Sequence, residues 1–441
     1  MKCKFIRADS ENLISICEEL GMRGKMALGP IMDTVAGVLE NIRLRGDDAV
    51  REYTKKFDKV EIAPGGFRVT QEEIDRAYAS VDPDLLRIMT QAAENIRIFH
   101  ERQLESGYML ENGPGAKVGM RVRPLSVAGV YVPGGTAPLP STVMMDVIPA
   151  KVAGVPRVVL CTPPRADASV DPVILAAARI AGADEIYRVG GAQAIGAMAC
   201  GTLEIPRVDK ICGPGNIYVN TAKRLVYGQV DIDMFAGPSE ILILADESAD
   251  PEFVAADMLS QAEHDKLASA ITLTTSEKLA KEILAAVDRR FEQSDRKEIL
   301  EASLRDYCAV LLVDDLETAV AFSDELAPEH LELCVKDPDE YIPMIRNAGA
   351  IFVGNYTPEP LGDYYAGPNH TLPTSGTARF FSPLSTGDFL KKTSILRYDK
   401  QALFECYKDV AAFADAEGLS AHAQAVRVRF EKEENEKVRE G

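Results

Sequence analysis

The segment LGDYYAGPNH at residues 361–370 combines side chains that could do chemistry with residues that bend the backbone. Asp363 and His370 offer a carboxylate and an imidazole, groups that bind metal ions and transfer protons. The glycines and the proline between them interrupt helix and strand, so we predict a shaped loop. Loops held on a rigid scaffold often carry catalytic groups. The alternative is a surface turn with a capping aspartate and a solvated histidine.

Histidine is scarce in this chain, so each occurrence can be judged separately; the five are His100, His264, His330, His370 and His422. In the stretch DMLSQAEHD, Gln261 and His264 are three residues apart on a predicted helix and therefore share a face. An imidazole together with amide and carboxylate oxygens could bind a borderline metal such as zinc. An ordinary polar helix face is the alternative for this segment.

Two further histidines lie close to glutamates. Glu329 and His330 are adjacent in LAPEHLEL, and they place two titrating groups at one point. Such a pair suits a reaction that moves more than one proton; the alternative is a helix end with a histidine near the dipole terminus. Glu417 and His422 flank a turn-to-helix junction in EGLSAHAQAV. Four of the five histidines thus lie beside carboxylates at loops or helix ends, which favours a metal site with His, Asp and Gln ligands.

His100 is the exception. It lies in the polar part of a long helix predicted from Gln71 to about Ser106, which opens with the capping box of Thr70 and Glu73. Charged residues follow it directly, so we predict a solvated or interface histidine and not a ligand.

The elements that must position these residues alternate between strand and helix. Apolar runs such as RVVLCTPP at 157–164 and SEILILAD at 239–246 are typical of buried strands, and helical stretches separate them. One such helix, DPVILAAARIAGA, opens with Asp171 and has Pro172 at its first position. The alternation predicts βαβ units, parallel sheets and two α/β lobes. Short helical segments are expected before and after them.

Small residues gather at four predicted junctions between strand and helix: VPGGTAP (132–138), VGGAQAIG (189–196), CGPGN (212–216) and AGPSE (236–240). In an open α/β sheet, ligands bind beyond the carboxyl ends of the strands, and helix N-termini favour phosphates. The chain has no G-x-G-x-x-G sequence. The cluster therefore indicates an atypical dinucleotide site, with tight packing at each turn as the alternative.

Composition excludes several classes of protein. The 441 residues are 46% hydrophobic and 27% charged, with a formal net charge of −19, which argues against nucleic acid or an anionic membrane as partner. The N-terminal sequence lacks the apolar core of a signal peptide, and no apolar run is long enough to predict a transmembrane helix. The eight cysteines form no C-x-x-C pair. Free thiols of this kind fit a reducing cytosol, so a cytoplasmic location is expected.

Eight motifs between about residues 30 and 430 resemble, in the same order, those of the histidinol dehydrogenase family. They are GVYVPGGTAPLPST, GGAQAIGA, VDKICGPGN, MFAGPSE, SQAEHD, APEHLEL, LGDYYAGPNHTLPTSGTAR and EGLSAHAQAV. The resemblance implies an NAD-linked, zinc-dependent, four-electron oxidation of L-histidinol to L-histidine through L-histidinaldehyde, at the end of histidine biosynthesis. It also implies a homodimer with shared active sites.

The resemblance further implies two incomplete Rossmann-like lobes with parallel sheets, plus small helical segments at both ends. The expected domains are an N-terminal helical segment at 1–25, a catalytic and zinc-binding lobe at 26–130 and 238–384, an NAD-binding lobe at 131–237, and a C-terminal helical segment at 385–441 that completes the partner's site.

Site roles follow from the same resemblance. The implied zinc ligands are Gln261, His264, Asp363 and, from the partner subunit, the residue equivalent to His422. Glu329 is expected to activate water and His330 to act as general base. The expected substrate contacts are Ser239, Gln261, His264, His330, Asp363, His370, Glu417 and His422, and the expected NAD contacts are Tyr131, Gln193 and Asn216.

Three other functions remain to be distinguished. Relatives such as sulfopropanediol dehydrogenases keep the zinc set but oxidise other small alcohols; Glu417 and the motif EGLSAH favour histidinol. A zinc hydrolase would need no nucleotide lobe, and the Gly-rich turns disfavour it. A non-enzymatic scaffold is disfavoured by the adjacent Glu329 and His330.

Overall fold

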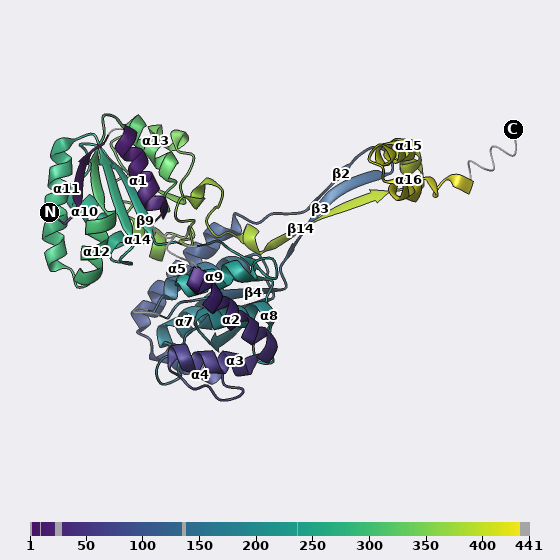
Figure 1. The fold of residues 1–441 in the computed structure, drawn as a ribbon, viewed down its shortest axis with the longest axis horizontal. Helices are drawn as coiled ribbons and strands as arrows, with labels where there is room; N and C mark the ends of the chain where they lie inside the picture. Colours follow the sequence, from purple (N-terminus) through teal and green to yellow (C-terminus); the bar gives the residue numbers. More distant parts are fainter. Residues whose placement is uncertain (1, 9, 23–28, 135–137, 236, 433–441) are drawn as a thin grey trace. The chain divides into compact units, whose positions relative to one another are not determined.

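A computed structural model of residues 1–441 gives the fold (Figure 1). It describes all residues except 1, 9, 23–28, 135–137, 236 and 433–441. Parts of the predicted turns VPGGTAP and AGPSE, and most of the charged C-terminal tail, lie outside the described residues. The chain forms two compact units. The first comprises Met1–Leu104 and Leu125–Phe389, and the second comprises Glu105–Pro124 and Leu390–Gly441. The predicted division into four domains is finer than this and stays a prediction.

The first unit contains a six-stranded parallel sheet with the strand order β1-β11-β10-β9-β12-β13. Its strands are β1 (Lys4–Arg7), β9 (Glu240–Ala245), β10 (Ser269–Thr274), β11 (Ala309–Leu312), β12 (His330–Cys334) and β13 (Ala350–Val353). Strand β12 is internal, because His330 pairs with Ile241 of β9 on one side and with Ala350 of β13 on the other.

Alternate residues of β9 enter two different cores, as expected for a sheet that is buried on both faces. Ile241 and Ile243 pack with helices α10, α11 and α12, whereas Leu242 and Leu244 pack with α13 and residues of α1. These helices are α1 (Ser10–Met22), α10 (Pro251–Ala262), α11 (Glu277–Gln293), α12 (Lys297–Tyr307) and α13 (Leu316–Leu326) (Figure 1). The N-terminal segment thus contains the predicted helix and, in addition, a strand that joins the sheet.

A second parallel sheet of five strands, in the order β6-β5-β4-β7-β8, also lies in the first unit. Its strands are β4 (Val127–Tyr131), β5 (Arg157–Thr162), β6 (Glu185–Arg188), β7 (Lys210–Cys212) and β8 (Asp231–Ile232). Its helices are α2 (Gly29–Arg45), α3 (Asp47–Tyr53), α6 (Pro140–Val152), α7 (Pro172–Ala181), α8 (Gly191–Cys200) and α9 (Ile217–Val226). Asp171 caps α7 with Pro172 in its first turn, as predicted. The prediction of two α/β lobes with parallel sheets is confirmed.

The predicted long helix from Gln71 is wrong in its extent, because two helices occupy this stretch: α4 (Gln71–Ser80) and α5 (Pro83–Glu101). The side chain of Asp82 caps α5, and Pro83 occupies its first turn, where proline ends one helix and begins the next. The capping box of Thr70 and Glu73 is confirmed at the start of α4.

The predicted solvent exposure of His100 is also wrong. Its side chain is fully buried, with Nδ1 2.7 Å from the carbonyl oxygen of Ile96 and Nε2 3.3 Å from Nδ2 of Asn369. The charged residues that follow it in sequence do not decide its environment, because the segment around Asn369 covers it.

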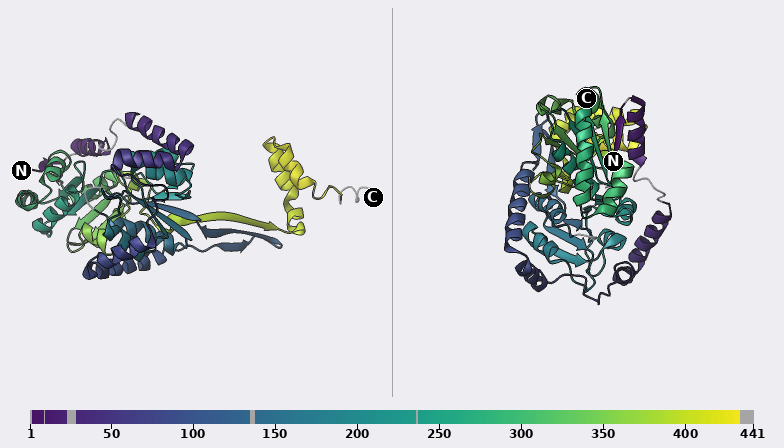
Figure 2. Two further views of the ribbon diagram at one scale, coloured as in Figure 1. Left: turned by 90° about the horizontal axis from the view of Figure 1, so that it is seen from below. Right: turned by 90° about the vertical axis from the view of Figure 1, so that its left-hand side faces the viewer.

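The second unit is a three-stranded antiparallel sheet, β14-β3-β2, followed by two helices (Figure 2). The elements are β2 (Tyr108–Glu111), β3 (Ala116–Pro124), β14 (Leu390–Tyr398), α15 (Lys400–Ala416) and α16 (Ser420–Arg427). Aromatic packing joins the last helices to the following turn, with the rings of Tyr407 and Phe430 4.6 Å apart. The C-terminal segment is therefore helical as predicted, but it begins with a strand.

The shorter elements are η1 (Thr54–Asp58), η2 (Pro338–Glu340), η3 (Ile342–Met344), α14 (Glu359–Tyr364), η4 (Thr377–Arg379) and η5 (Thr386–Phe389). All eight cysteines are free thiols, five of them buried. Within the described part of the chain, no helix combines the length and the apolar character needed to cross a bilayer.

Candidate active site

Glu329 and His330 lie at the start of the internal strand β12. The side chains of both residues are hydrogen-bonded to the backbone of Glu240. The backbone N–H of Glu240 donates to Oε2 of Glu329 at 2.9 Å. Nδ1 of His330 lies 3.1 Å from the carbonyl oxygen of Glu240. A carbonyl only accepts, so Nδ1 carries the proton in this bond and Nε2 is left as the basic nitrogen. The parallel pairing of β12 with β9 thereby fixes the tautomer of His330.

The basic nitrogen of His330 is buried and has no hydrogen-bond partner among the described residues. Burial lowers the pKa of His330 to about 4, against the opposing effect of the nearby Asp363. The ring is therefore neutral near pH 7, in the state that can accept a proton. The predicted role of general base fits this arrangement.

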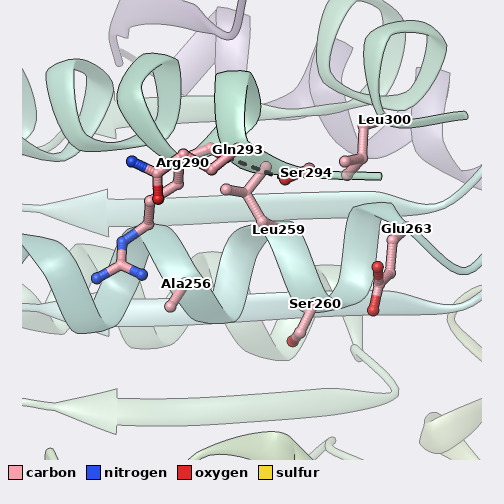
Figure 3. A pocket seen from close by; sticks show the side chains of 8 residues that line it. All are labelled: Ala256, Leu259, Ser260, Glu263, Arg290, Gln293, Ser294 and Leu300. Atoms are coloured by element: carbon pink, nitrogen blue, oxygen red, sulfur yellow. Dashed lines mark hydrogen bonds between the residues drawn. The ribbon is translucent and has the colours of Figure 1, made fainter. Parts of the chain in front are cut away.

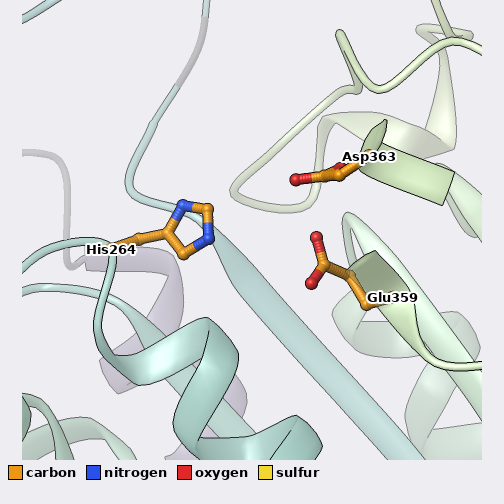
Figure 4. Close-up of side chains that lie close together, drawn as sticks. All are labelled: His264, Glu359 and Asp363. Atoms are coloured by element: carbon orange, nitrogen blue, oxygen red, sulfur yellow. The ribbon is translucent and has the colours of Figure 1, made fainter. Parts of the chain in front are cut away.

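A group of possible metal ligands lies at the ends of α10 and α14. Ligand atoms of His264, Glu359 and Asp363 all lie within 4.8 Å of one another. Figure 4 shows the ring of His264 facing the two carboxylates. Two of these residues, His264 and Asp363, were predicted as ligands from the sequence.

Gln261 supplies an independent sign that a cation fits here. It lies in the last turn of α10, and its side chain is 0% exposed. Neither its Oε1 nor its Nε2 has a hydrogen-bond partner among the described residues. A fully buried amide without a partner is costly and rare in folded proteins. An amide oxygen, an imidazole and a carboxylate together form a donor set that suits zinc.

Sequence reasoning missed Glu359. Its side chain is buried, and Oε1 lies 3.9 Å from Nε2 of His330. Burial and the neighbouring Asp363 raise the pKa of Glu359 to about 10. The available signal was the spacing of Glu359 and Asp363, four residues apart, which brings two carboxylates to one face of a helix.

That signal was hidden because residues 361–364 were predicted to be loop, whereas they belong to α14. Pro360 is tolerated there because it lies in the first helical turn, where a backbone N–H has no partner in the helix. Gly362 allows close packing: a Cβ atom at this position would lie 2.7 Å from Cε1 of Phe352. The ring of Phe352 in turn lies 5.9 Å from that of His330. The remainder of the predicted loop, from Tyr365, is irregular as expected.

His370 and Ser239 lie in irregular segments of the same unit. The chain turns at Gly367, with φ +113°, and a Cβ atom there would lie 2.7 Å from the carbonyl oxygen of Asn95. His370 follows, half-buried, and its Nε2 has no hydrogen-bond partner among the described residues. Ser239 immediately precedes β9 and is half-buried. Their predicted contacts with substrate stay predictions.

Glu417 and His422 belong to the second unit. Glu417 is the C-terminal cap residue of α15, and His422 lies in α16. The structure therefore does not test their contribution to a site in the first unit, and their roles stay predictions.

The predicted NAD contacts lie at the carboxyl ends of strands in the five-stranded sheet or on the following helices. Tyr131 ends β4, and its hydroxyl accepts a hydrogen bond of 3.1 Å from the N–H of Gly191. Gln193 of α8 is buried and donates from Nε2 to Asp58 Oδ2 at 3.0 Å, while its Oε1 has no partner among the described residues. Asn216 caps α9. The unpartnered oxygen of Gln193 leaves an acceptor for a ligand hydroxyl.

Protein packing accounts for two glycines of the Gly-rich turns. A Cβ atom on Gly190 would lie 2.6 Å from the ring of Pro163, and one on Gly213 would lie 2.1 Å from the carbonyl oxygen of Tyr131. These glycines are required by the fold alone. Their presence is therefore no sign of a dinucleotide site.

A shallow hollow lies among α10, α11 and α12 (Figure 3). Its lining residues are Ala256, Leu259, Ser260, Glu263, Arg290, Gln293, Ser294 and Leu300. Neither Gln261 nor His264 lines it, and it contains no histidine. The hollow is therefore separate from the possible metal ligands.

Comparison with known proteins identifies the family of this chain. The family model described as histidinol dehydrogenase matches residues 22–430. The chain is 53% identical to histidinol dehydrogenase from Heliobacterium mobile over 398 residues, which cover 90% of this chain and 93% of that protein. It is also 53% identical to histidinol dehydrogenase from Bacillus subtilis over 396 residues, covering 90% and 92%. A crystal structure of histidinol dehydrogenase from Elizabethkingia anophelis superimposes with a TM-score of 0.91 and 40% identity, covering 98% of each chain. The chain belongs to the histidinol dehydrogenase family.

Proposed function

We propose that this chain oxidises L-histidinol to L-histidine through L-histidinaldehyde, as an NAD-linked and zinc-dependent oxidoreductase of histidine biosynthesis. The observation that carries the proposal is the buried His330, held in one tautomer by Glu240 and next to the acidic ligand group of α14. Gln261, His264 and Asp363 would hold Zn²⁺ together with His422 from a second copy of the chain. When bound, Zn²⁺ would orient the imidazole and amine of the substrate, and NAD⁺ would accept a hydride in each oxidation.

The first oxidation needs a base for the hydroxyl proton. Nε2 of His330 accepts that proton, while the proton on Nδ1 stays in the hydrogen bond to Glu240. The imidazolium that forms lies between two acids, with Nδ1 3.7 Å from Glu329 Oε2 and Nε2 3.9 Å from Glu359 Oε1. The carboxylate of Glu329 stabilises the charged ring, whereas Glu359, with its pKa raised to about 10, is neutral near pH 7. Removal of the hydroxyl proton and of a hydride from the same carbon gives the aldehyde.

The second oxidation needs water. As water adds to the aldehyde carbon, Glu329 accepts a proton from the water, and His330 returns the proton gained in the first oxidation to the aldehyde oxygen. The hydrated aldehyde then loses a hydroxyl proton to the neutral His330 and its carbon-bound hydrogen as hydride. In total, one L-histidinol, one water and two NAD⁺ give one L-histidine, two NADH and three protons. The adjacent positions of Glu329 and His330 support both half-reactions at one place.

We also propose a homodimer with shared sites and a cytoplasmic location. Apolar side chains on the second unit support an interface, since Leu396 of β14 and Phe413 of α15 are each 72% exposed. Eight free cysteines support a reducing compartment.

The deciding experiment follows NADH absorbance with L-histidinol and NAD⁺, with and without a chelator. We expect two NADH for each L-histidinol, loss of turnover on chelation and recovery with added zinc. A hydrolase would form no NADH. Oxidation of sulfopropanediol but not of L-histidinol would overturn the substrate assignment while leaving the oxidoreductase class intact.

A further inference from the structure

A cluster of ionisable side chains is buried in the first unit, and none of its members is among the groups that the proposed chemistry uses. Lys223 of α9 and Asp146 of α6 are each 0% exposed, and Asp233, just after β8, is 8% exposed. Burial of three such groups is costly unless each is bonded, and apolar residues would fill the same space without that cost. The cluster therefore calls for an explanation beyond the stability of the fold.

One end of the cluster holds the turn that begins at Gly213. Lys223 pairs with Asp233 and also donates from Nζ to the carbonyl oxygen of Gly213 at 3.0 Å. Oδ2 of Asp233 accepts from the N–H of Gly213 at 2.8 Å. Both polar backbone groups of Gly213 are thus fixed, three residues before the predicted NAD contact Asn216. A Cβ atom on Gly213 would lie 3.1 Å from Asp146 Oδ2, so this turn also lies against Asp146.

The other end of the cluster holds the two residues that flank His370. Oγ1 of Thr371 donates to Oδ1 of Asp146 at 2.9 Å. Nδ2 of Asn369 donates to the carbonyl oxygen of Met145 at 2.7 Å, and its Oδ1 accepts from the N–H of Thr371 at 2.8 Å. His370 itself is only half-buried. Its neighbours on both sides are anchored to consecutive residues of α6, so the position of its ring depends on that anchor.

We propose that Asp146 and Thr371 form a positioning link that sets the His370 segment relative to the Gly213–Asn216 turn. The inference rests on the proposed function, in which His370 contacts L-histidinol and the turn lies on the NAD side. The link touches neither reactant. It acts through His370, so its loss weakens the use of L-histidinol more than the binding of NAD⁺.

The protonation state of Asp146 makes Asp146→Asn the conservative substitution at this position. Burial and the nearby Asp233 raise the pKa of Asp146 to about 8, so the carboxyl is mostly protonated near pH 7. Asparagine has the same shape, is neutral and keeps an oxygen that can accept from Thr371. Asp146→Asn should therefore preserve the link, as should Thr371→Ser, whereas Asp146→Leu and Thr371→Val remove it.

The test compares these variants in the zinc-loaded, full-length protein, with steady-state kinetics for L-histidinol and calorimetric titration of NAD⁺. Loss of one buried hydrogen bond predicts that Thr371→Val raises KM for L-histidinol roughly tenfold with a smaller change in kcat. Thr371→Ser and Asp146→Asn should stay close to wild type, and the dissociation constant of NAD⁺ should change less than KM. The double variant Asp146→Leu/Thr371→Val should be no worse than its more impaired parent.

Thr272→Val is the matched control. Thr272 of β10 is also buried, and its hydroxyl has no hydrogen-bond partner among the described residues, so the KM of this variant should stay at the wild-type value. If Thr371→Val also keeps the wild-type KM, or if Thr371→Ser is as impaired as Thr371→Val, the link is refuted, and neither result depends on whether Asp146→Leu folds. If the wild-type protein does not oxidise L-histidinol at all, the proposed function fails, which is a separate result.

Discussion

Nδ1 of His330 is hydrogen-bonded to the carbonyl oxygen of Glu240, and Nε2 has no hydrogen-bond partner among the described residues. Nε2 can therefore accept the substrate proton, which leaves the activation of water to Glu329. His330→Asn removes the base for both oxidations, so kcat should fall on the order of 10²–10⁴-fold with either L-histidinol or L-histidinaldehyde. Glu329→Gln keeps an oxygen that can accept from Glu240 but loses the base for water. It should spare the alcohol step more than the aldehyde step. Equal losses in both half-reactions would show that the division of roles is wrong.

Asp58 predicts a pH dependence of stability that does not involve the metal ligands. Burial raises the pKa of Asp58 to about 6, against the hydrogen bond from Gln193, which lowers it. The folded state therefore holds this proton more tightly than the unfolded chain, whose aspartate pKa is about 3.9. The resulting stabilisation is fully present below about pH 4 and is lost as the pH rises through about 6.

The variant Asp58→Asn isolates the contribution of this proton to stability, because the asparagine side chain is neutral at every pH. Relative to wild type, the variant should gain stability between about pH 4 and 6 and then level off. The measurement is the difference in urea midpoint between the two proteins at several pH values. A difference that stays constant with pH would contradict the raised pKa.

At this scale, the sequence revealed residues whose chemistry is local and missed those whose role depends on distant neighbours. His330, Asp363 and Gln261 stood out by type and spacing. Glu359 of α14 did not, because its importance comes from its proximity to His330 of strand β12 and from burial. His100 was misjudged for the same reason: a segment more than two hundred residues later in the chain covers it.

At the scale of elements, strand β13 supports the catalytic pair through a glycine. A Cβ atom on Gly349, just before β13, would lie 2.5 Å from the carbonyl oxygen of Glu329. That oxygen also accepts from the N–H of Ala350 at 2.9 Å. Gly349→Ala should therefore displace the backbone of Glu329, destabilise the fold by about 1–3 kcal/mol and lower kcat further than that loss explains. Denaturant unfolding and steady-state kinetics of the same preparation test this.

Gly37→Ala is the control for that variant. Gly37 lies on an exposed face of α2, where an added Cβ atom would meet nothing within 4 Å. This substitution should stabilise the protein by about 0.5–1 kcal/mol and leave kcat unchanged. If Gly349→Ala also leaves stability and kcat undiminished, the close approach of Gly349 to the backbone of Glu329 does not matter for activity.

The alternation of elements was predictable because each βαβ unit is marked by local patterns of apolar residues and turns. The predicted helix boundaries were wrong at prolines, because a proline can end one helix or occupy the first turn of another. Pro83 divides a stretch that looks like one helix, and Pro360 begins a short helix where a loop was predicted. Strand β1 has four residues, and it is recognisable only through its pairing with β11, at the other end of the lobe's sequence.

At the scale of the whole molecule, the proposed sharing of sites predicts complementation between inactive variants. A subunit with His422→Asn should retain zinc weakly, and one with Glu329→Gln should oxidise aldehyde poorly. In a mixed dimer, one of the two sites would combine intact Glu329 with intact His422. Random mixing after refolding should then restore about a quarter of the wild-type activity, since half of the dimers are mixed.

Each variant refolded alone is the control for the mixing experiment and should convert little L-histidinol to L-histidine. No recovery in the mixture, with dimers present by light scattering, would mean that each site is built within one chain. Recovery with His422→Asn but not with a variant elsewhere in α16 would locate the shared group at that residue.

The pairing of β1 with β11 also has a consequence for synthesis of the chain. Lys4 pairs with Ala309, which lies about three hundred residues later in the sequence and is therefore synthesised much later. At roughly 5–20 residues per second, the first strand waits on the order of fifteen seconds or longer. The strands of the five-stranded sheet all lie between Val127 and Ile232, so that sheet can close during this interval. The sheet that carries the catalytic pair is therefore completed later than the five-stranded sheet, and its first strand can join it only after β11 has been synthesised.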